Sequence, residues 1–291
     1  MRILIRIGLL LCGLLLVAYG SLVLALWMHQ DSFVFNRSTI VPETLVGRMR
    51  QGGLELVRAP GPQGEMVFWA SPTDRAAKGI VLYTPGNGGS AADWGDRPSA
   101  AVRAGFAVVA VGYPGYDGNP GAPSEIGMIV AAKAQLAWAQ ERWPDQPIVL
   151  WGESMGGAVA IAVASDTKVA GVITDGTFTS IRELGQRMFP YVPVGWLVQN
   201  QFDSLARMPR IRAPVLIVHG ANDRLVPADM APRLVAAATC AVMPLLLPRV
   251  GHTAWAWSLR NDEKGNPTQG VVMKFLADAA SGSLGGCALS P

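Results

Sequence analysis

Histidine and cysteine are scarce in this sequence, with three of each among 291 residues. Metal sites in proteins are built from clusters of histidine, cysteine and carboxylate side chains at short spacings. No stretch of the sequence contains such a cluster with ligand spacing. We therefore expect no metal ion, and no motif indicates an organic cofactor.

Charge is also low, because charged residues make up 15% of the chain and the formal net charge is +3. The Lys and Arg residues are scattered singly, whereas a nucleic-acid site needs a dense basic block. We therefore expect no nucleic-acid partner. Apolar residues make up 50% of the chain, enough for one large domain with a sizeable core.

The N-terminal region lacks charged side chains from Ile7 to Met28, a run of 22 residues. A helix of this length crosses a bilayer core of about 30 Å. The alternative is a cleaved secretory signal, because Ala18-Tyr-Gly20 offers small residues for cleavage. The apolar run continues past that site, which favours an uncleaved transmembrane anchor over residues 1–30.

Arg2 and Arg6 precede the apolar run, and positive residues beside a spanning helix favour the cytoplasmic side. We therefore expect the rest of the chain on the non-cytoplasmic side, in the periplasm, the lumen or the exterior. Residues 31–52 show no clear period and are interpreted as a linker. Residues 53–281 are interpreted as the folded domain and residues 282–291 as a flexible tail.

Cysteine pairing depends on that compartment. Cys12 lies inside the predicted anchor, whereas Cys240 and Cys287 lie in the C-terminal third. In an oxidising compartment the last two can form a disulfide. The alternative is a buried thiol at one position and a free cysteine in the tail.

Short extended runs at Leu54–Arg58 and Glu65–Ala70, separated by a turn-rich stretch, predict a β-hairpin. Compact apolar runs follow, of the kind found in strands buried on both faces of a sheet. They are Gly79–Tyr83, Ala107–Val111, Pro147–Trp151, Val169–Thr174, Pro214–His219 and Met243–Leu247.

Alanine-rich segments of helical length alternate with these runs. They lie at about 97–104, 125–142, 155–165, 228–238 and 268–280. Alternating strands and helices predict an α/β fold with a mainly parallel sheet and helices on both faces. Such sheets place their sites beyond the carboxyl ends of the strands.

One motif at such a strand end indicates nucleophilic chemistry. The sequence Gly152-Glu-Ser154-Met-Gly156 follows an apolar strand directly and runs into a small-residue helix. This is the pattern of a nucleophile elbow, in which glycines leave room for a strained turn that exposes the serine. Ser154 is therefore the candidate nucleophile, although a purely structural turn is the alternative.

A serine needs a base to remove its proton, and histidine is the side chain whose pKa suits that task. His29 lies at the membrane flank, and His219 ends a predicted strand where it is expected to be packed. His252, in the loop after the last predicted strand, is the candidate base.

The third group should be a carboxylate that orients the imidazole. Asp223 follows the strand Pro214–His219, and the order Ser154, Asp223, His252 is the one expected for such a triad. Asp175, at the end of the preceding strand, is the rival. We favour Asp223 because of its position in the loop.

The oxyanion that forms during attack needs preorganised donors, usually backbone amides. The N–H of Met155, directly after the serine, is one candidate. The other is the N–H of Asn87 in the loop Thr84-Pro-Gly-Asn-Gly-Gly89, whose glycines let the amides turn inward. A simple turn is the alternative interpretation of that loop.

Several motifs together resemble the membrane-anchored α/β-hydrolase-domain serine hydrolases, over about residues 50–280. The motifs are Pro85–Gly89, Gly112–Gly118, Pro123–Glu125, Gly152–Gly156, Thr177–Ser180, His219–Pro227 and Gly251–His252. The resemblance implies the α/β-hydrolase fold, the same triad and esterase or lipase-like activity. Family members usually have His-Gly-Asn in the oxyanion loop, where this chain has Pro85-Gly86-Asn87.

The stretch from Thr177 to Met208 is aromatic-rich and is interpreted as the wall of the site or a small lid. We expect a serine hydrolase that cleaves a small-molecule or lipid-like carboxylic ester. A thioesterase or peptidase with the same triad is one alternative, because the nucleophile does not select the leaving group. A catalytically silent binding protein of the same fold is another.

Overall fold

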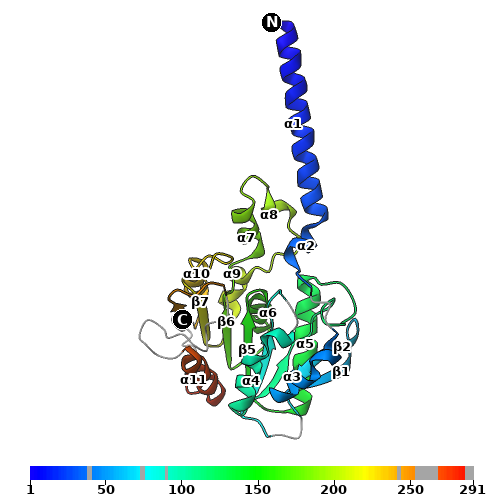
Figure 1. Cartoon of the computed structure of the whole chain (residues 1–291). Helices are drawn as coiled ribbons and strands as arrows, with labels where there is room; N and C mark the ends of the chain where they lie inside the picture. Colours follow the sequence, from blue (N-terminus) through cyan, green and yellow to red (C-terminus); the bar gives the residue numbers. More distant parts are fainter. Residues whose placement is uncertain (38–40, 73–75, 89–90, 241–243, 253–267, 286–291) are drawn as a thin grey trace.

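An eight-stranded sheet forms the centre of the structure, a computed structural model of the chain (Figure 1). The structure describes residues 1–37, 41–72, 76–88, 91–240, 244–252 and 268–285. The strands are β1 (Glu55–Gly61), β2 (Gly64–Ala70), β3 (Ile80–Thr84), β4 (Ala107–Ala110), β5 (Ile148–Glu153), β6 (Gly171–Asp175), β7 (Val215–Gly220) and β8 (Leu245–Leu247).

The strand order is β1-β2-β4-β3-β5-β6-β7-β8. β1 and β2 form an antiparallel hairpin, and β2 also pairs antiparallel with β4. All the other pairs are parallel. The predicted hairpin and mainly parallel sheet are confirmed.

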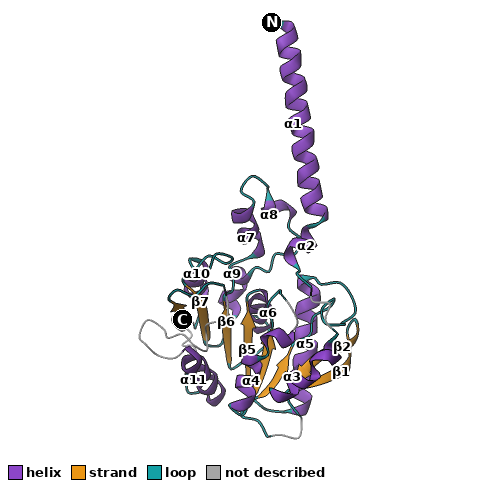
Figure 2. Ribbon diagram, in the orientation of Figure 1, coloured by secondary structure: helices purple, strands orange, loops and turns teal. Residues whose placement is uncertain are grey.

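Helices cover both faces of this sheet (Figure 2). They are α2 (Gln30–Val34), α3 (Val46–Gln51), α4 (Asp96–Arg103), α5 (Glu125–Arg142), α6 (Met155–Ala164), α7 (Ile181–Met188), α8 (Val194–Leu197), α9 (Ser204–Arg207), α10 (Met230–Ala237) and α11 (Thr268–Ser281). Short 3₁₀ turns lie at Pro42–Leu45, Ala91–Trp94 and Met208–Arg210.

Two apolar clusters define the two faces. Leu136 of α5, Ile161 of α6 and Leu234 of α10 pack into one cluster. Ala101 of α4 and Phe275 of α11 pack into the other. Because the central strands are buried on both faces, they carry continuous apolar runs without alternation.

The segment 31–52 differs from the expected linker, because it contains α2 and α3. Phe35 and Met49 are only 4% and 2% exposed, and the ring of Phe35 packs edge-on against Phe202. This stretch is therefore folded onto the domain. Helices of five and six residues are too short to show a clear period in the sequence.

Helix α1 (Arg2–Met28) projects from the domain, and none of its residues is buried (Figure 1). Its 27 residues are long and apolar enough to cross a membrane by length and composition. The predicted tail from residue 286 onward lies outside the described residues. Cys287 lies there too, so the choice between a Cys240–Cys287 disulfide and two separate thiols stays a prediction.

Candidate active site

Ser154 lies at the sharp turn between β5 and α6, with φ 49° and ψ −117°. Residues other than glycine rarely adopt a positive φ, and such strain costs of order 1–3 kcal/mol. The N–H of Ser154 donates to the carbonyl oxygen of Asp175 at 2.7 Å. The pairing of β5 with β6 thus extends into the turn and holds the strained residue in place.

Two glycines allow this turn to form. A Cβ at Gly152 would lie 2.4 Å from the carbonyl oxygen of Gly156. A Cβ at Gly156 would lie 2.1 Å from the carbonyl oxygen of Thr84 on β3. In both cases the obstructing atom belongs to the backbone, so no side-chain movement can relieve the clash.

His252 lies between Ser154 and Asp223. Its Nε2 is 3.0 Å from Oγ of Ser154, and its Nδ1 is 2.7 Å from Oδ2 of Asp223. An ionised carboxylate can only accept, so Nδ1 carries the proton in this arrangement. In the neutral imidazole with this tautomer, Nε2 has a free lone pair and can accept the hydroxyl proton of Ser154. The three side chains come from loops after β5, β7 and β8, at one rim of the sheet.

Asp223 is held as an ionised acceptor. Its other oxygen, Oδ1, accepts hydrogen bonds from the N–H groups of Leu225 and Val226, each at 2.8 Å. Burial alone would raise the pKa of the Asp223 carboxyl. The hydrogen bonds from His252 and from the Val226 amide outweigh that effect and hold the pKa below its ordinary value.

The rival residues take other positions, and two of them lie close to the candidate triad. His29 follows α1, and His219 is fully buried, with Nε2 2.9 Å from the carbonyl oxygen of Val226 and 3.5 Å from Oδ2 of Asp223. The side chain of Asp175 pairs with Arg97 at 3.5 Å. Among the residues that the structure describes, no group of three or more His, Cys, Asp or Glu side chains is placed to hold a metal ion.

A buried charge cluster lies beside the turn, and it was not predicted from the sequence. Arg97 of α4 is an ion-pair partner of both Glu153 and Asp175, and all three side chains are almost completely buried. Burial raises the pKa of Glu153 to about 8, with a further contribution from Asp175, while Arg97 opposes the shift. Burial also raises the pKa of Asp175. One cation thus lies between two buried carboxyl groups next to Ser154 and favours their ionised forms against the effect of burial.

Replacing Arg97 with methionine should lower the free energy of unfolding by about 3–5 kcal/mol, because two buried carboxylates lose their only described cationic partner. Denaturant unfolding of the detergent-solubilised protein measures the loss. Arg103→Met is the matched control, since Arg103 lies exposed on the same helix and should change stability by less than about 0.5 kcal/mol. Equal stabilities of the two variants would contradict this role for Arg97.

The loop after β3 passes close to Ser154, since a Cβ at Gly86 would lie 3.6 Å from the Cβ of Ser154. Within the described part of the chain, the N–H groups of Asn87 and Met155 donate to no protein acceptor. For Met155 this follows from its place in the first turn of α6, where amides have no intrahelical partner. Both amides are therefore available to a ligand.

Side chains fix this loop from two directions. Oδ1 of Asn87 accepts from the Tyr116 hydroxyl at 2.8 Å and from the N–H of Asn36 at 2.9 Å. Nδ2 of Asn87 donates to the carbonyl oxygen of Val34 at 2.5 Å. The hydroxyl of Tyr113 donates to the carbonyl oxygen of Pro85 at 3.2 Å. These contacts support the loop where Pro85 replaces the usual histidine.

Individual roles for Tyr113 and Tyr116 were not predicted from the sequence. Both belong to the motif Gly112–Gly118, which was noted only as part of the resemblance. A tyrosine-rich loop after a buried strand was the available signal, because strand ends gather at the rim where the site lies.

The aromatic segment Thr177–Met208 contains α7, α8 and α9. Phe178 and Phe202 are buried in the core, whereas Tyr191 and Trp196 are 88% and 90% exposed. The aromatic side chains thus divide into a core-filling group and an exposed group near the end of α1.

Comparison with known proteins agrees with this architecture. A family model described as alpha/beta hydrolase fold matches residues 79–197. The uncharacterized protein Rv2307c of Mycobacterium tuberculosis is 31% identical over 271 residues, which cover 91% of this chain and 93% of that protein. The lysophosphatidylserine lipase ABHD12 of Mus musculus is 28% identical over 194 residues.

The ABHD12 match covers 59% of this chain and 48% of the relative, so the chain spans about half the length of that protein. Among solved structures, the esterase Pf2001 of Pyrococcus furiosus superposes with a TM-score of 0.63 at 17% identity. The match covers 86% of this chain and all of the esterase. At that identity the likeness establishes the fold alone.

Proposed function

Since the chain belongs to the α/β-hydrolase superfamily, we propose that it is a membrane-anchored serine hydrolase that cleaves carboxylic esters. The observation that carries the proposal is the chain of contacts from Ser154 Oγ to His252 at 3.0 Å and from His252 to Asp223 at 2.7 Å. These distances are within reach for proton transfer and for orientation of the imidazole.

In the proposed mechanism, Ser154 Oγ attacks the ester carbonyl while Nε2 of His252 takes its proton. Asp223 keeps the proton on Nδ1 and stabilises the imidazolium that forms. The amides of Met155 and Asn87 hold the oxyanion. His252 then returns its proton to the leaving alcohol, and an acyl-enzyme remains. Water, deprotonated by His252, cleaves this ester and restores the Ser154 hydroxyl.

The membrane part of the proposal rests on α1. None of its residues is buried by the domain, and a bilayer can cover its exposed apolar surface. Arg2 and Arg6 favour a cytoplasmic N-terminus, with the catalytic domain on the opposite side. The name of the ABHD12 relative, a lysophosphatidylserine lipase, favours an ester of a lipid as substrate.

Labelling with a fluorophosphonate probe tests the enzyme proposal directly, because the probe reacts with a serine only when a base has activated it. We expect the full-length protein to be labelled and Ser154→Ala to be unlabelled. An unlabelled full-length protein would instead favour a silent binding module. Turnover of matched ester, thioester and amide substrates then identifies the leaving group, and we expect the ester to react fastest.

A further inference from the structure

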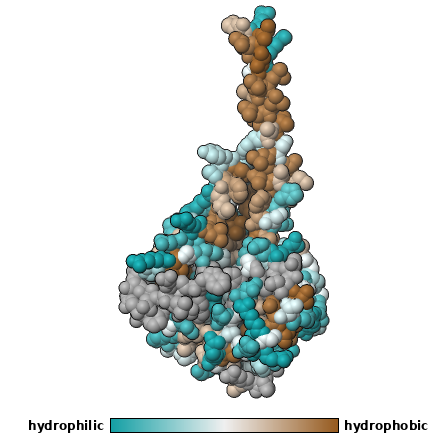
Figure 3. Space-filling view, in the orientation of Figure 1, coloured by the Kyte–Doolittle hydropathy of each residue, from teal (hydrophilic) through white to brown (hydrophobic). Residues whose placement is uncertain are grey.

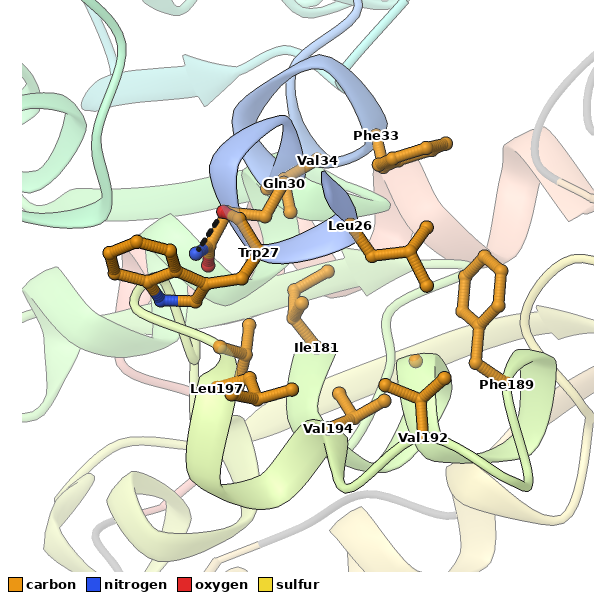
Figure 4. A pocket seen from close by; sticks show the side chains of 12 residues that line it. Leu26, Trp27, Gln30, Phe33, Val34, Ile181, Phe189, Val192, Val194 and Leu197 are labelled. Atoms are coloured by element: carbon orange, nitrogen blue, oxygen red, sulfur yellow. Dashed lines mark hydrogen bonds between the residues drawn. The ribbon is translucent and has the colours of Figure 1, made fainter. Parts of the chain in front are cut away.

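An apolar groove lies between the end of α1 and the helices α7 and α8 (Figure 4). Its cavity has a volume of about 100 Å³. The residues that line it include Leu26, Trp27 and Phe33 on one side and Ile181, Val194 and Leu197 on the other. A polar exception, Gln30, has its amide hydrogen-bonded to the backbone at Trp27 and Gln199. Gln30 apart, the side chains that line the groove are apolar, so the groove suits an apolar ligand.

The connection between α7 and α8 runs alongside α1. The hydroxyl of Tyr19 donates to the carbonyl oxygen of Tyr191 at 2.6 Å. Tyr19 lies nine residues before Met28, the last residue of α1, which places this contact about 13 Å along the helix axis. If α1 crosses a bilayer, the tip around Tyr191 lies at the depth of the acyl chains.

Backbone carbonyls in this tip (residues 188–198) have hydrogen-bond donors from the protein, as an apolar medium requires. The side-chain amide of Gln186 lies within hydrogen-bond distance of the carbonyl oxygens of Phe189, Pro190 and Val192, at 3.3, 3.3 and 3.0 Å. Tyr19 satisfies the carbonyl between them, that of Tyr191. In water these carbonyls need no protein donors, but in lipid an unsatisfied carbonyl costs several kcal/mol.

The side chains at the tip agree with this placement. Met188, Tyr191 and Trp196 are 57%, 88% and 90% exposed. Soluble proteins rarely expose a continuous apolar patch without a partner, and Trp and Tyr are enriched where proteins meet a membrane. The apolar surface of α1 continues onto the adjoining end of the domain (Figure 3).

One hydrogen bond links the groove to the candidate active site. Val34 lines the groove, and its carbonyl oxygen accepts the hydrogen bond from Nδ2 of Asn87. Asn87 belongs to the loop beside Ser154, so a residue of the groove is bonded directly to the residue that supplies the proposed oxyanion donor.

We propose that this groove binds a hydrocarbon chain of a lipid ester taken from the bilayer, with the tip 188–198 immersed in the same leaflet. This inference rests on the proposed ester hydrolysis and membrane anchor, and it specifies their substrate as a long-chain lipid ester. The lipid is favoured over a protein occupant because the last turn of α1 forms one wall together with α2, so the groove lies beside the segment that a bilayer surrounds.

Photo-crosslinking tests the occupant without catalysis. Full-length Ser154→Ala is placed in phosphatidylcholine nanodiscs with a long-chain alkyl ester that carries a diazirine at the chain end. We expect adducts on peptides from residues 26–34 and 181–198. Adducts confined to the rest of α1 would show ordinary bilayer contact and would overturn the proposal. An absence of adducts on the groove peptides would overturn it too.

A second test measures the kinetics of a variant in which a larger side chain fills the groove. Val194→Phe should lower the ratio of kcat/KM for long-chain over short-chain esters by at least about tenfold, since each buried methylene is worth about fourfold. Val130→Phe is the matched control, because Val130 is 37% exposed on α5 outside the groove, and it should leave the ratio unchanged. An unchanged ratio in both variants would contradict an acyl-chain site here.

The two levels of proposal fail separately. A wild-type protein that the fluorophosphonate probe does not label would contradict the proposed hydrolase activity. A labelled wild-type protein without adducts in the groove would agree with the hydrolase proposal and contradict only the proposed lipid-chain site.

Discussion

Replacing His252 with alanine is expected to lower kcat for an ester substrate by about 10⁶-fold, because the hydroxyl of Ser154 then has no base within reach. Removing one member of a cooperating triad costs nearly as much as removing all of it, so little activity should remain beyond that of oxyanion stabilisation and binding. Steady-state hydrolysis of a short-chain chromogenic ester measures the loss.

His29→Ala is the control for that experiment. His29 lies at the end of α1 and is outside the site, so its removal should leave kcat unchanged. If the His252 variant kept more than about a tenth of the activity, another base would have to serve Ser154, and the proposed mechanism would be wrong.

Asp223→Asn should lower kcat by about 10⁴-fold with little change in the arrangement of the site. An amide can donate to Nδ1 of His252, which then favours the tautomer with its proton on Nε2. That nitrogen can no longer accept the proton of Ser154. The comparison is best made at a saturating ester concentration, so that kcat is measured without a contribution from binding.

Asp175→Asn distinguishes the two carboxylates. The side chain of Asp175 pairs with Arg97 and acts on His252 only through its charge, whereas Asp223 accepts a hydrogen bond from His252, so this variant should keep most of its kcat. Its free energy of unfolding should decrease instead, because the variant loses one carboxylate of the charge cluster around Arg97. Full activity in Asp223→Asn with loss in Asp175→Asn would reverse the assignment of the orienting acid.

The sequence predicted regular elements well where they were long and apolar. The helix expected at 125–142 is α5 with the same bounds, and the strand expected at 147–151 is β5, displaced by one or two residues. Ser124 marks the start of α5 because its hydroxyl accepts the N–H of Gly127 and caps the helix. Such signals are local, so they can be detected without tertiary contacts.

Other features depend on partners that lie far apart in the chain. Arg97 meets Glu153 across 56 positions, and Tyr19 meets Tyr191 across 172. Neither pairing leaves a periodic pattern. Glu153 offered one local clue, since a carboxylate at the end of a buried strand needs a positive partner, but the clue does not identify the partner.

The roles of Ser154, Asp223 and His252 were inferred from motif, order and elimination. The geometry brings their side chains together, and activity measurements must assign their chemistry. The supporting tyrosines could not be inferred in the same way, because their hydrogen bonds to Pro85 and Asn87 depend on how two loops pack.

The contacts of Asn87 have a practical consequence for anyone who trims the protein to make it water-soluble. A version that begins at Arg37 discards the Val34 carbonyl and the Asn36 amide, and with them two of the three hydrogen bonds that hold the Asn87 side chain. A version that begins at Gln30 lacks α1 but retains both of these backbone groups. The position of the truncation therefore determines whether the isolated domain keeps the Asn87 loop in place beside Ser154.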